Sequence, residues 1–200
     1  MEQKRIGIIL AGGESRRFGT HKAFAQLKNK YFFEHAQGAL EGIVEDIIIV
    51  SHPATIEKFK ENTSFTIIED LPEYKGNGPL AGILTAMSQK KGNWYVVLPC
   101  DTPFVTNQLI EQMLSFTLEK NIDAVIPVID GRTQPLIGLY HYRVKEKIEK
   151  LLNQGQYKMG FLLDSCSVRY VTNSDLSMNG KEFDNINHQS EYEKAKQNEM

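Results

Sequence analysis

Short apolar runs alternate with longer segments of helical periodicity along the first two-thirds of the chain. The runs have the length of buried strands, and the segments between them repeat apolar residues at the spacing of one helix face. The predicted strands are residues 5–10, 46–50, 65–69, 94–99 and 123–128, and the predicted helices are residues 31–43, 56–62, 80–90 and 108–120. This alternation predicts an α/β fold: a three-layer sandwich in which helices cover both faces of a mostly parallel sheet.

The last third of the chain has a less regular pattern. Residues 133–141 are predicted as a further strand, residues 182–187 as a short extended piece, and residues 144–153, 161–164 and 190–197 as helices. No internal repeat, low-complexity tract or interdomain linker separates this third from the rest. We therefore expect residues 1–200 to form a single domain.

Charge and cysteine content narrow the function classes. The formal net charge is −2 and the pI is near 6.2, so the chain has no overall attraction for nucleic acid or an anionic membrane, which favours a small-molecule partner. Cys100 and Cys166 lie far apart, without a second Cys or His at metal-site spacing, so we expect neither a disulfide framework nor a zinc site. A cytoplasmic location fits best. No apolar run approaches the ~20 residues that a membrane-spanning helix needs.

Polar or glycine-rich segments follow three of the predicted strands. They are AGGESRRFG after the first strand, EDLPEYKGNGPLAG after the third and PCDTPF after the fourth. In parallel α/β sheets, ligands bind beyond the carboxyl ends of the strands. Coincident turns could explain any one of these segments, but their convergence on one edge of the sheet favours a nucleotide site.

The glycine turn after the first strand has two interpretations. It is not a P-loop, because five residues instead of four separate Gly13 from the next glycine, and it also lacks the G-x-G-x-x-G spacing of dinucleotide folds. Gly12 and Gly13 could bring backbone N–H groups close to a phosphate, with positive charge supplied by Arg16, Arg17 and Lys22. Alternatively, a tight turn simply ends the strand and a solvated basic stretch follows it.

Two carboxylates follow predicted strands at the same edge. Asp101 could bind Mg²⁺ together with substrate phosphate oxygens, or it could begin a helix, since Asp or Thr before Pro is a common helix start. Asp70 follows the third strand in the same way, and the glycines of residues 76–82 again allow close approach to the backbone. Cys100 is more simply a small buried residue than a nucleophile, and the five histidines show no Ser-His-Asp or metal-ligand pattern.

Several motifs together resemble a known family. LAGGESRRFGTHK looks like the signature L-A-G-G-x-S-x-R-[MF]-G-x-x-K of nucleotidyltransferases, which sugar-nucleotide and cytidylyl enzymes share. GPLAG, PCDTPF and FDNIN, taken with it, resemble the molybdenum cofactor guanylyltransferase family over nearly the whole chain. LAGG in place of LAAG, combined with PCDTPF, points to the guanylyl branch.

The resemblance implies a fold, a reaction and partners. The fold would be the Rossmann-like sandwich of the nucleotide-diphospho-sugar transferase type, with an N-terminal nucleotide-binding part and a substrate side over about residues 125–200. The reaction would join GMP from Mg²⁺·GTP to the terminal phosphate of molybdopterin, which releases pyrophosphate. GTP and molybdopterin would be the partners, with neither nucleic acid nor membrane. The resemblance leaves open contacts with other cofactor-biosynthesis proteins and the oligomeric state.

It also implies residue roles. Lys22, Arg17 and Asp101 would be catalytic, with Asp101 also holding Mg²⁺. The GTP-binding residues would be Leu10, Ala11, Gly12, Gly13, Lys22, Asp70, Gly82 and Asp101, and the residues facing the pterin substrate would be Gln134, Pro135, Asn185 and Asn187. The family often has Asn after its second strand; Ser51 and His52 stand there in this chain, so no guanosine contact is assigned to that position.

Charge alone makes this chemistry reasonable. A phosphate that attacks the α-phosphorus of a triphosphate brings anions together, so catalysis depends on orientation and charge neutralisation. The attacking phosphate is already ionised near neutral pH, so a general base is unnecessary, which agrees with the absence of a histidine-based dyad. Two alternatives remain: a cytidylyl or sugar-phosphate nucleotidyltransferase on the same fold, and a noncatalytic nucleotide-binding module.

Overall fold

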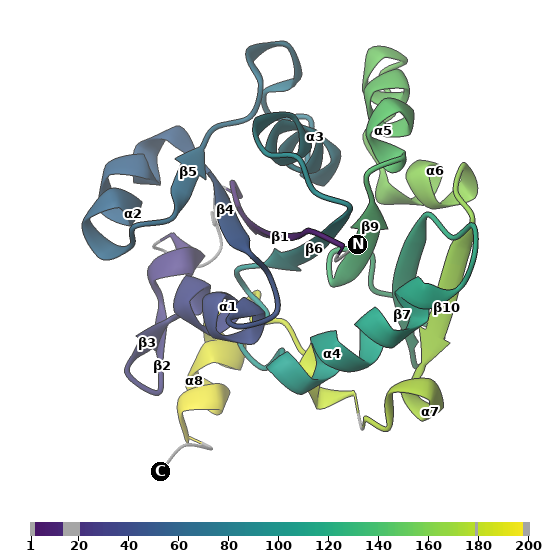
Figure 1. Ribbon diagram of the computed structural model, residues 1–200. Helices are drawn as coiled ribbons and strands as arrows, with labels where there is room; N and C mark the ends of the chain where they lie inside the picture. Colours follow the sequence, from purple (N-terminus) through teal and green to yellow (C-terminus); the bar gives the residue numbers. More distant parts are fainter. Residues whose placement is uncertain (1–2, 14–20, 179, 198–200) are drawn as a thin grey trace.

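One central sheet organises the molecule (Figure 1). The computed structural model describes residues 3–13, 21–178 and 180–197, and within them eight strands form a sheet of order β10-β7-β9-β6-β1-β4-β5, with β8 paired to β7. The strands are β1 (Arg5–Ala11), β4 (Asp46–Ser51), β5 (Thr66–Ile68), β6 (Trp94–Pro99), β7 (Ala124–Ile129), β8 (Arg132–Thr133), β9 (Gly138–His141) and β10 (Val168–Thr172). β2 (Gln26–Leu27) and β3 (Lys30–Tyr31) form a separate antiparallel hairpin.

Helices cover both faces of the sheet. They are α1 (Phe32–Leu40), α2 (Ile56–Asn62), α3 (Pro79–Gln89), α4 (Asn107–Ser115), α5 (Val144–Asn153), α6 (Met159–Asp164), α7 (Asn173–Leu176) and α8 (Gln189–Gln197). Short 3₁₀ turns are η1 (Lys22–Phe24), η2 (Pro53–Thr55), η3 (Pro72–Tyr74), η4 (Phe116–Leu118) and η5 (Lys181–Phe183). In Figure 1, α3, α5 and α6 lie on one face and α1, α4 and α7 on the other. Among the described residues, no helix combines the length and apolar character needed to cross a bilayer.

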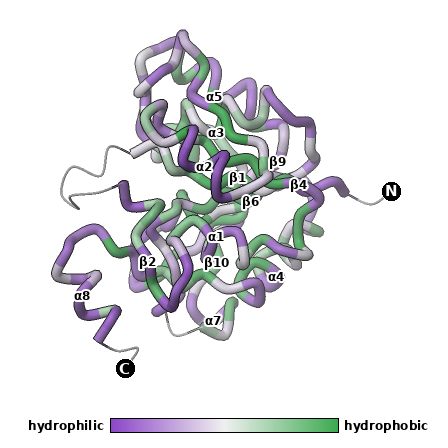
Figure 2. The backbone as a smooth tube through the Cα atoms, turned by 90° about the vertical axis from the view of Figure 1, so that its left-hand side faces the viewer, coloured by the Kyte–Doolittle hydropathy of each residue, from purple (hydrophilic) through white to green (hydrophobic). Residues whose placement is uncertain are grey.

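The central strands are buried from both sides. Ile8 and Ile9, neighbours in β1, are both fully buried, yet Ile8 packs in the core under α3 and α5 and Ile9 in the core under α1 and α4. Because successive side chains of a strand point to opposite faces, a strand between two helical layers needs an unbroken apolar run. Figure 2 shows these apolar residues gathered along the central strands, whereas α8 is mostly hydrophilic.

The strand pairing confirms a mostly parallel sheet. β1 lies between β4 and β6 and is parallel to both, with Ala11 opposite Ser51 and Leu10 opposite Pro99. β5 is parallel to β4, and β10 is parallel to β7. β9 runs antiparallel to both β6 and β7 and joins them. The carboxyl ends of β1, β4, β5 and β6 therefore meet at one edge, while strands from the last third of the chain extend the same sheet.

Several predicted boundaries were wrong. The helix predicted to reach residue 43 ends at Leu40, because Gly42 adopts a left-handed φ of 75°. The strand predicted from residue 133 starts at Gly138, after a turn in which Ile137 N donates to Gln134 O. The extended piece predicted at residues 182–187 begins inside the 3₁₀ turn η5. The hairpin β2–β3, the edge strand β10 and the short helix α7 were not predicted.

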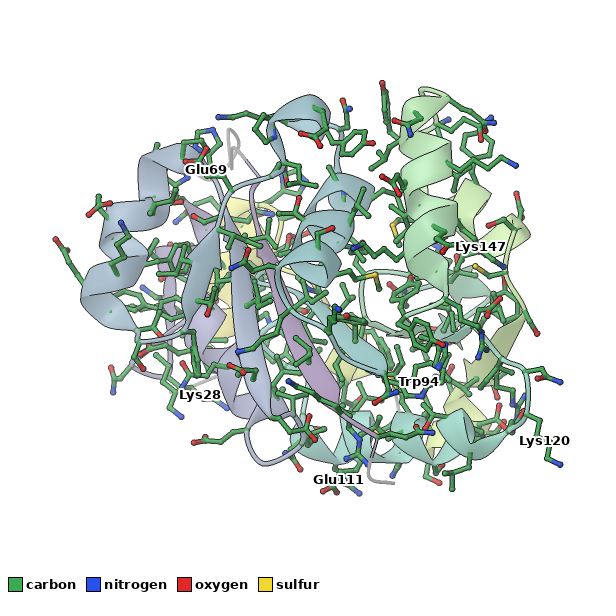
Figure 3. All side chains as sticks on the ribbon, turned by 45° about the horizontal axis from the view of Figure 1, so that its top comes forward. Lys28, Glu69, Trp94, Glu111, Lys120 and Lys147 are labelled. Carbon is green, nitrogen blue, oxygen red and sulfur yellow. The ribbon has the colours of Figure 1, made fainter. Side chains whose placement is uncertain are left out.

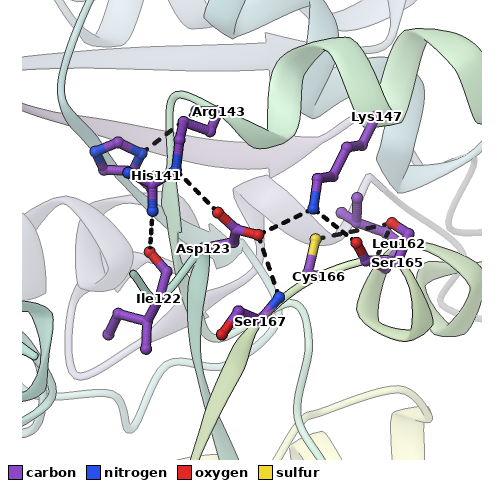
Figure 4. Close-up of polar contacts among 9 residues, drawn as sticks. All are labelled: Ile122, Asp123, His141, Arg143, Lys147, Leu162, Ser165, Cys166 and Ser167. Carbon is purple, nitrogen blue, oxygen red and sulfur yellow. Dashed lines mark hydrogen bonds and ion pairs between the residues drawn. The ribbon is translucent and has the colours of Figure 1, made fainter. Parts of the chain in front are cut away.

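A network around Asp123 ties the last strands to α5 (Figure 4). The Asp123 carboxylate accepts hydrogen bonds from Arg143 Nε at 3.0 Å, Lys147 Nζ at 2.9 Å and Ser167 N at 3.1 Å. Burial on its own raises the pKa of Asp123, but the bonds from Lys147, Ser167 and Arg143 outweigh it and hold the pKa below its usual value. The network therefore stabilises the folded state while Asp123 is ionised.

Changing Asp123 to Asn should lower the free energy of unfolding by about 2 kcal/mol at neutral pH, because two cations lose their partner in a largely buried position. A lowered folded-state pKa gives stability that is complete above the unfolded carboxyl pKa and is lost as pH falls through the folded value. Urea unfolding should thus show the variant and wild type converging in acid. Glu119→Gln, which breaks an exposed pair with Arg169, should cost under about 0.5 kcal/mol. Equal losses in both variants would contradict this.

Candidate active site

A cleft of about 620 Å³ opens at the edge where the four parallel strands end. The strands and the turns after them supply its walls: Leu10 to Gly13 after β1, Val50 to Pro53 after β4, Glu69 and Asp70 after β5, and Pro99 to Asp101 after β6. Glu69 is labelled in Figure 3 beside the end of β5, far from Trp94 at the start of β6. The topology thus gathers at this edge the three segments that the sequence singled out.

Gly12 and Gly13 form an open floor. Neither has a left-handed φ, so the turn does not need glycine for its backbone conformation. A Cβ built on either one would meet no atom of the described residues within 4 Å, its chain neighbours aside, and both residues line the cleft. Their missing side chains therefore leave space for a ligand to approach the backbone amides closely.

Lys22 lines the same cleft from the start of η1. Its Nζ is 3.1 Å from Asp101 Oδ2, and it donates to Asn187 Oδ1 at 2.5 Å. The Lys22 and Asp101 side chains are only 14% and 22% exposed. An ammonium in so confined a position, bonded from two sides, has a nearly fixed location, which suits a charge that must meet a phosphate in one geometry.

A second wall comes from the segment after β5. Asp70 Oδ2 accepts from Gly76 N at 3.2 Å, and partial burial raises the pKa of Asp70 more than this bond and Lys75 lower it. Gly82 lies beneath, where a Cβ would come within 3.0 Å of the Leu10 side chain and 3.6 Å of Asp70 Oδ1. Glycine at this position allows α3 to approach the end of β1, so a side chain here would disturb the cleft.

The wall after β4 carries hydroxyl and imidazole groups. Ser51 and Thr55 are buried, and their hydroxyls hydrogen bond at 2.9 Å. His52 Nδ1 accepts from Ala54 N at 3.2 Å, so its other ring nitrogen carries the proton in the neutral form. The His52 ring lies 5.8 Å from that of His21, and both residues line the cleft. Sequence reasoning assigned no role to either histidine.

Cys100 is not a nucleophile at neutral pH. Burial and then the neighbouring negative charge of Asp101 raise the pKa of the Cys100 thiol to about 12. Since the thiolate is the reactive form, this residue acts as a small buried side chain at the end of β6.

The donor set suits Mg²⁺ better than a transition metal. No cluster of three His, Cys, Asp or Glu side chains occurs within the described ranges. Mg²⁺ typically takes one or two carboxylates and completes its shell with water and phosphate oxygens. Asp101 offers one such carboxylate in the cleft that Gly12 and Gly13 also line. Its Oδ2 faces Lys22, and no described residue hydrogen bonds to its Oδ1.

The predicted site residues fall into three groups. All eight predicted GTP-binding residues line the cleft. Asn187 reaches the cleft through its bond to Lys22. Three predicted residues do not line the cleft: Gln134, Pro135 and Asn185. Leu136, from the turn before β9, lines it instead of Gln134 and Pro135. Asn185 is exposed, next in sequence to the buried Ile186. Arg17 lies outside the described residues.

Comparison with known families agrees with this geometry. The model of the MobA-like NTP transferase domain matches residues 7–169. The chain belongs to this family. Membership makes the chain a nucleotidyltransferase, and the matched range contains the whole glycine floor, Lys22 and Asp101. Asn187 and α8 lie beyond the matched range.

Other members of the MobA-like family are similar over nearly their whole length. A protein of Bacillus mycoides, named probable molybdenum cofactor guanylyltransferase, is 43% identical over 96% of each chain. One of the same name from Halalkalibacterium halodurans is 43% identical over 92% of this chain and 93% of its own. The structure of molybdopterin-guanine dinucleotide biosynthesis protein A from Archaeoglobus fulgidus superposes with a TM-score of 0.80, 26% identity and coverage of 98% and 100%.

More distant structures define the fold. The synthetase for CMP-2-keto-3-deoxy-manno-octonic acid, complexed with CTP, has a TM-score of 0.75 at 13% identity, with 98% of each chain covered. Likeness at this level shows the fold alone. It confirms the nucleotide-diphospho-sugar transferase fold that the MobA-like family shares.

Proposed function

We propose that this chain transfers GMP from GTP to molybdopterin and releases pyrophosphate. The observation that carries the proposal is the contact between Lys22 Nζ and Asp101 Oδ2 at 3.1 Å, in the same cleft as the glycine floor. A cation and a carboxylate held together beside open backbone amides suit a metal-bound triphosphate. The names of the Bacillus and Archaeoglobus relatives supply the identity of the nucleotide and of the acceptor.

In the proposed reaction, an oxygen of the molybdopterin phosphate forms a bond to the α-phosphorus of GTP. The bond from that phosphorus to the β-phosphate bridging oxygen breaks, and pyrophosphate leaves with the electron pair. Lys22 neutralises charge that grows on the phosphoryl oxygens, and the amides of Gly12 and Gly13 orient the phosphates. Asp70 faces the guanosine portion. No side chain has to take a proton, because the attacking phosphate is already ionised.

Asp101 would hold Mg²⁺ through its carboxylate. When bound, Mg²⁺ supplies charge neutralisation of the triphosphate and orients it. Asn187 extends the arrangement toward the acceptor, because its side chain shares the Lys22 amine with Asp101. Asn185, Gln134 and Pro135 stay candidates for contacts with the pterin outside the cleft itself. The two cysteines are free thiols, and we propose a cytoplasmic setting for the reaction.

Incubation with GTP, Mg²⁺ and molybdopterin should give one pyrophosphate for each molybdopterin-guanine dinucleotide formed, measured by coupled pyrophosphate detection and chromatography. Omitting molybdopterin should abolish pyrophosphate release. GTP with Mg²⁺ should raise the melting temperature more than CTP does at the same concentration, because only the bound nucleotide stabilises the folded state.

Each alternative gives a different result in the same experiment. Preferential stabilisation by CTP, with no dinucleotide formed from GTP, would identify a cytidylyl or sugar-phosphate enzyme of the same fold. Saturable GTP binding without pyrophosphate release from any acceptor would identify a noncatalytic nucleotide-binding module. Either result would overturn the guanylyl assignment.

A further inference from the structure

The chain before α8 is fixed against the end of β6. Ile186 N donates to Asp101 O at 2.9 Å, which attaches the segment to the residue that carries the cleft carboxylate. The Ile186 side chain is 2% exposed and packs in a small cluster with Phe32 and Tyr192. The following residue, Asn187, is therefore held beside Lys22 by its backbone as well as by its side chain.

Glu191, in the first turn of α8, binds this backbone directly. Its Oε2 accepts from Asn187 N at 2.6 Å and from His188 N at 2.8 Å. The bond from His188 and then that from Asn187 lower the pKa of the Glu191 carboxyl, so it is anionic at neutral pH. In a capping box, the carboxylate in the first turn accepts only from the N–H of the residue before the helix, here His188. The second bond, to Asn187, extends beyond the box and reaches the residue that contacts Lys22.

The helix itself is anchored to the hairpin that follows Lys22. Tyr192 Oη donates to Gln26 O at 2.8 Å, and the Tyr192 ring meets Phe32 edge-on with centroids 6.0 Å apart. Figure 1 shows α8 beside β2 and β3. Gln26 lies shortly after η1, which begins with Lys22. Helix α8 therefore contacts both partners' neighbourhoods: it bonds to Gln26, shortly after Lys22, and to the backbone of Asn187.

We propose that Glu191 is a positioning residue for the transfer reaction. Through Asn187 it holds the Lys22 amine beside Asp101, and α8 acts as a strap that fixes the phosphate side of the cleft. A lysine side chain loses rotamer freedom when it is immobilised, so groups that restrain it beforehand favour the reactive arrangement. The inference rests on the proposed function in one respect, namely that Lys22 faces the triphosphate.

The test compares Glu191→Ala with Glu193→Ala. Glu193 is on the same exposed helix, and its Oε1 accepts only from the Gln189 side chain in the described structure, so its loss removes an equal charge without touching Asn187. Glu191→Ala should lower kcat for GMP transfer about tenfold, with the GTP Kd within about twofold of wild type. Glu191→Gln, which keeps an acceptor oxygen, should have an intermediate kcat.

Acylation of the Lys22 amine, mapped by mass spectrometry, should be faster in Glu191→Ala only.

The outcomes separate this inference from the proposed function. Faster Lys22 acylation and lower kcat, with an unchanged stoichiometry of GTP binding, support positioning. If kcat falls only in proportion to the fraction of protein that still binds GTP, or if Glu191→Ala behaves like Glu193→Ala, the role is structural and the inference is overturned. If no GMP is transferred even by wild type, yet Lys22 acylation rises in Glu191→Ala alone, the proposed function fails while the positioning by Glu191 stands.

Discussion

Replacement of Asp101 by Asn is expected to lower the rate of GMP transfer about 10³-fold, equivalent to about 4 kcal/mol of lost transition-state stabilisation. Asparagine has the same shape and can still accept from Lys22, and the backbone oxygen that Ile186 contacts is unchanged. The variant therefore loses one negative charge in a folded cleft. In the proposed site this is the charge that holds Mg²⁺, so single-turnover transfer measured against Mg²⁺ concentration should show the loss directly.

A second carboxylate in the same cleft provides the control for Asp101. Glu69 lines the rim, where it pairs with Lys75 at 3.1 Å and is 40% exposed. Glu69→Gln should keep the transfer rate within about threefold of wild type, since exposed pairs contribute little. GTP binding provides a readout independent of turnover: Mg²⁺ should tighten it in wild type and in Glu69→Gln, and much less in Asp101→Asn. Transfer by Asp101→Asn within tenfold of wild type would remove Asp101 from the mechanism.

The part of the cleft at the ends of the parallel strands was largely predictable because its segments are local in sequence. Each of the buried parallel strands has an apolar run that marks its end, and the topology of parallel sheets brings those ends to one edge. Leu10, Asp70 and Asp101 all follow from that rule together with their motifs. Sequence reasoning left two interpretations of Gly12 and Gly13 open, a phosphate-binding turn and a tight turn that ends the strand, and the structure shows that neither glycine has a left-handed φ and that both line the cleft.

The contact that brings Asn187 to the cleft was harder to predict because it is long-range. The contact between Lys22 and Asn187 joins residues 165 positions apart, and no periodicity or local motif encodes such a pair. In the turn before the antiparallel strand β9, Leu136 lines the cleft, whereas Gln134 and Pro135, predicted to face the pterin, do not line it. The hairpin β2–β3 turns through Lys28 and Asn29, both with positive φ, without the glycine that usually signals such a turn.

Replacement of Lys22 by Ala is expected to lower kcat for GMP transfer about 10²- to 10³-fold, with a smaller effect on the affinity for GTP. Charge on the phosphoryl oxygens near Lys22 grows as pyrophosphate departs, so the ammonium stabilises the transition state more than the bound nucleotide. Rapid-quench measurement of bound GTP conversion, alongside equilibrium GTP binding, separates the two effects. Lys22→Arg should recover little, because a planar guanidinium presents its N–H groups as a fixed fork, whereas Asp101 and Asn187 both bond to a single ammonium nitrogen.

The matched control for Lys22 is Lys75→Ala, which removes a cation from the same cleft. Lys75 Nζ pairs with Glu69 at the rim, where its side chain is 55% exposed, whereas the Lys22 side chain is 14% exposed. Lys75 should matter mainly for the first approach of the triphosphate. Lys75→Ala should therefore bind GTP more weakly than wild type does, with a difference that grows as the salt concentration is lowered, and its kcat should stay within about threefold of wild type. Equal losses of kcat in the two variants would mean that the cleft acts through its summed positive charge, and the specific placement of Lys22 between Asp101 and Asn187 would then carry no catalytic weight.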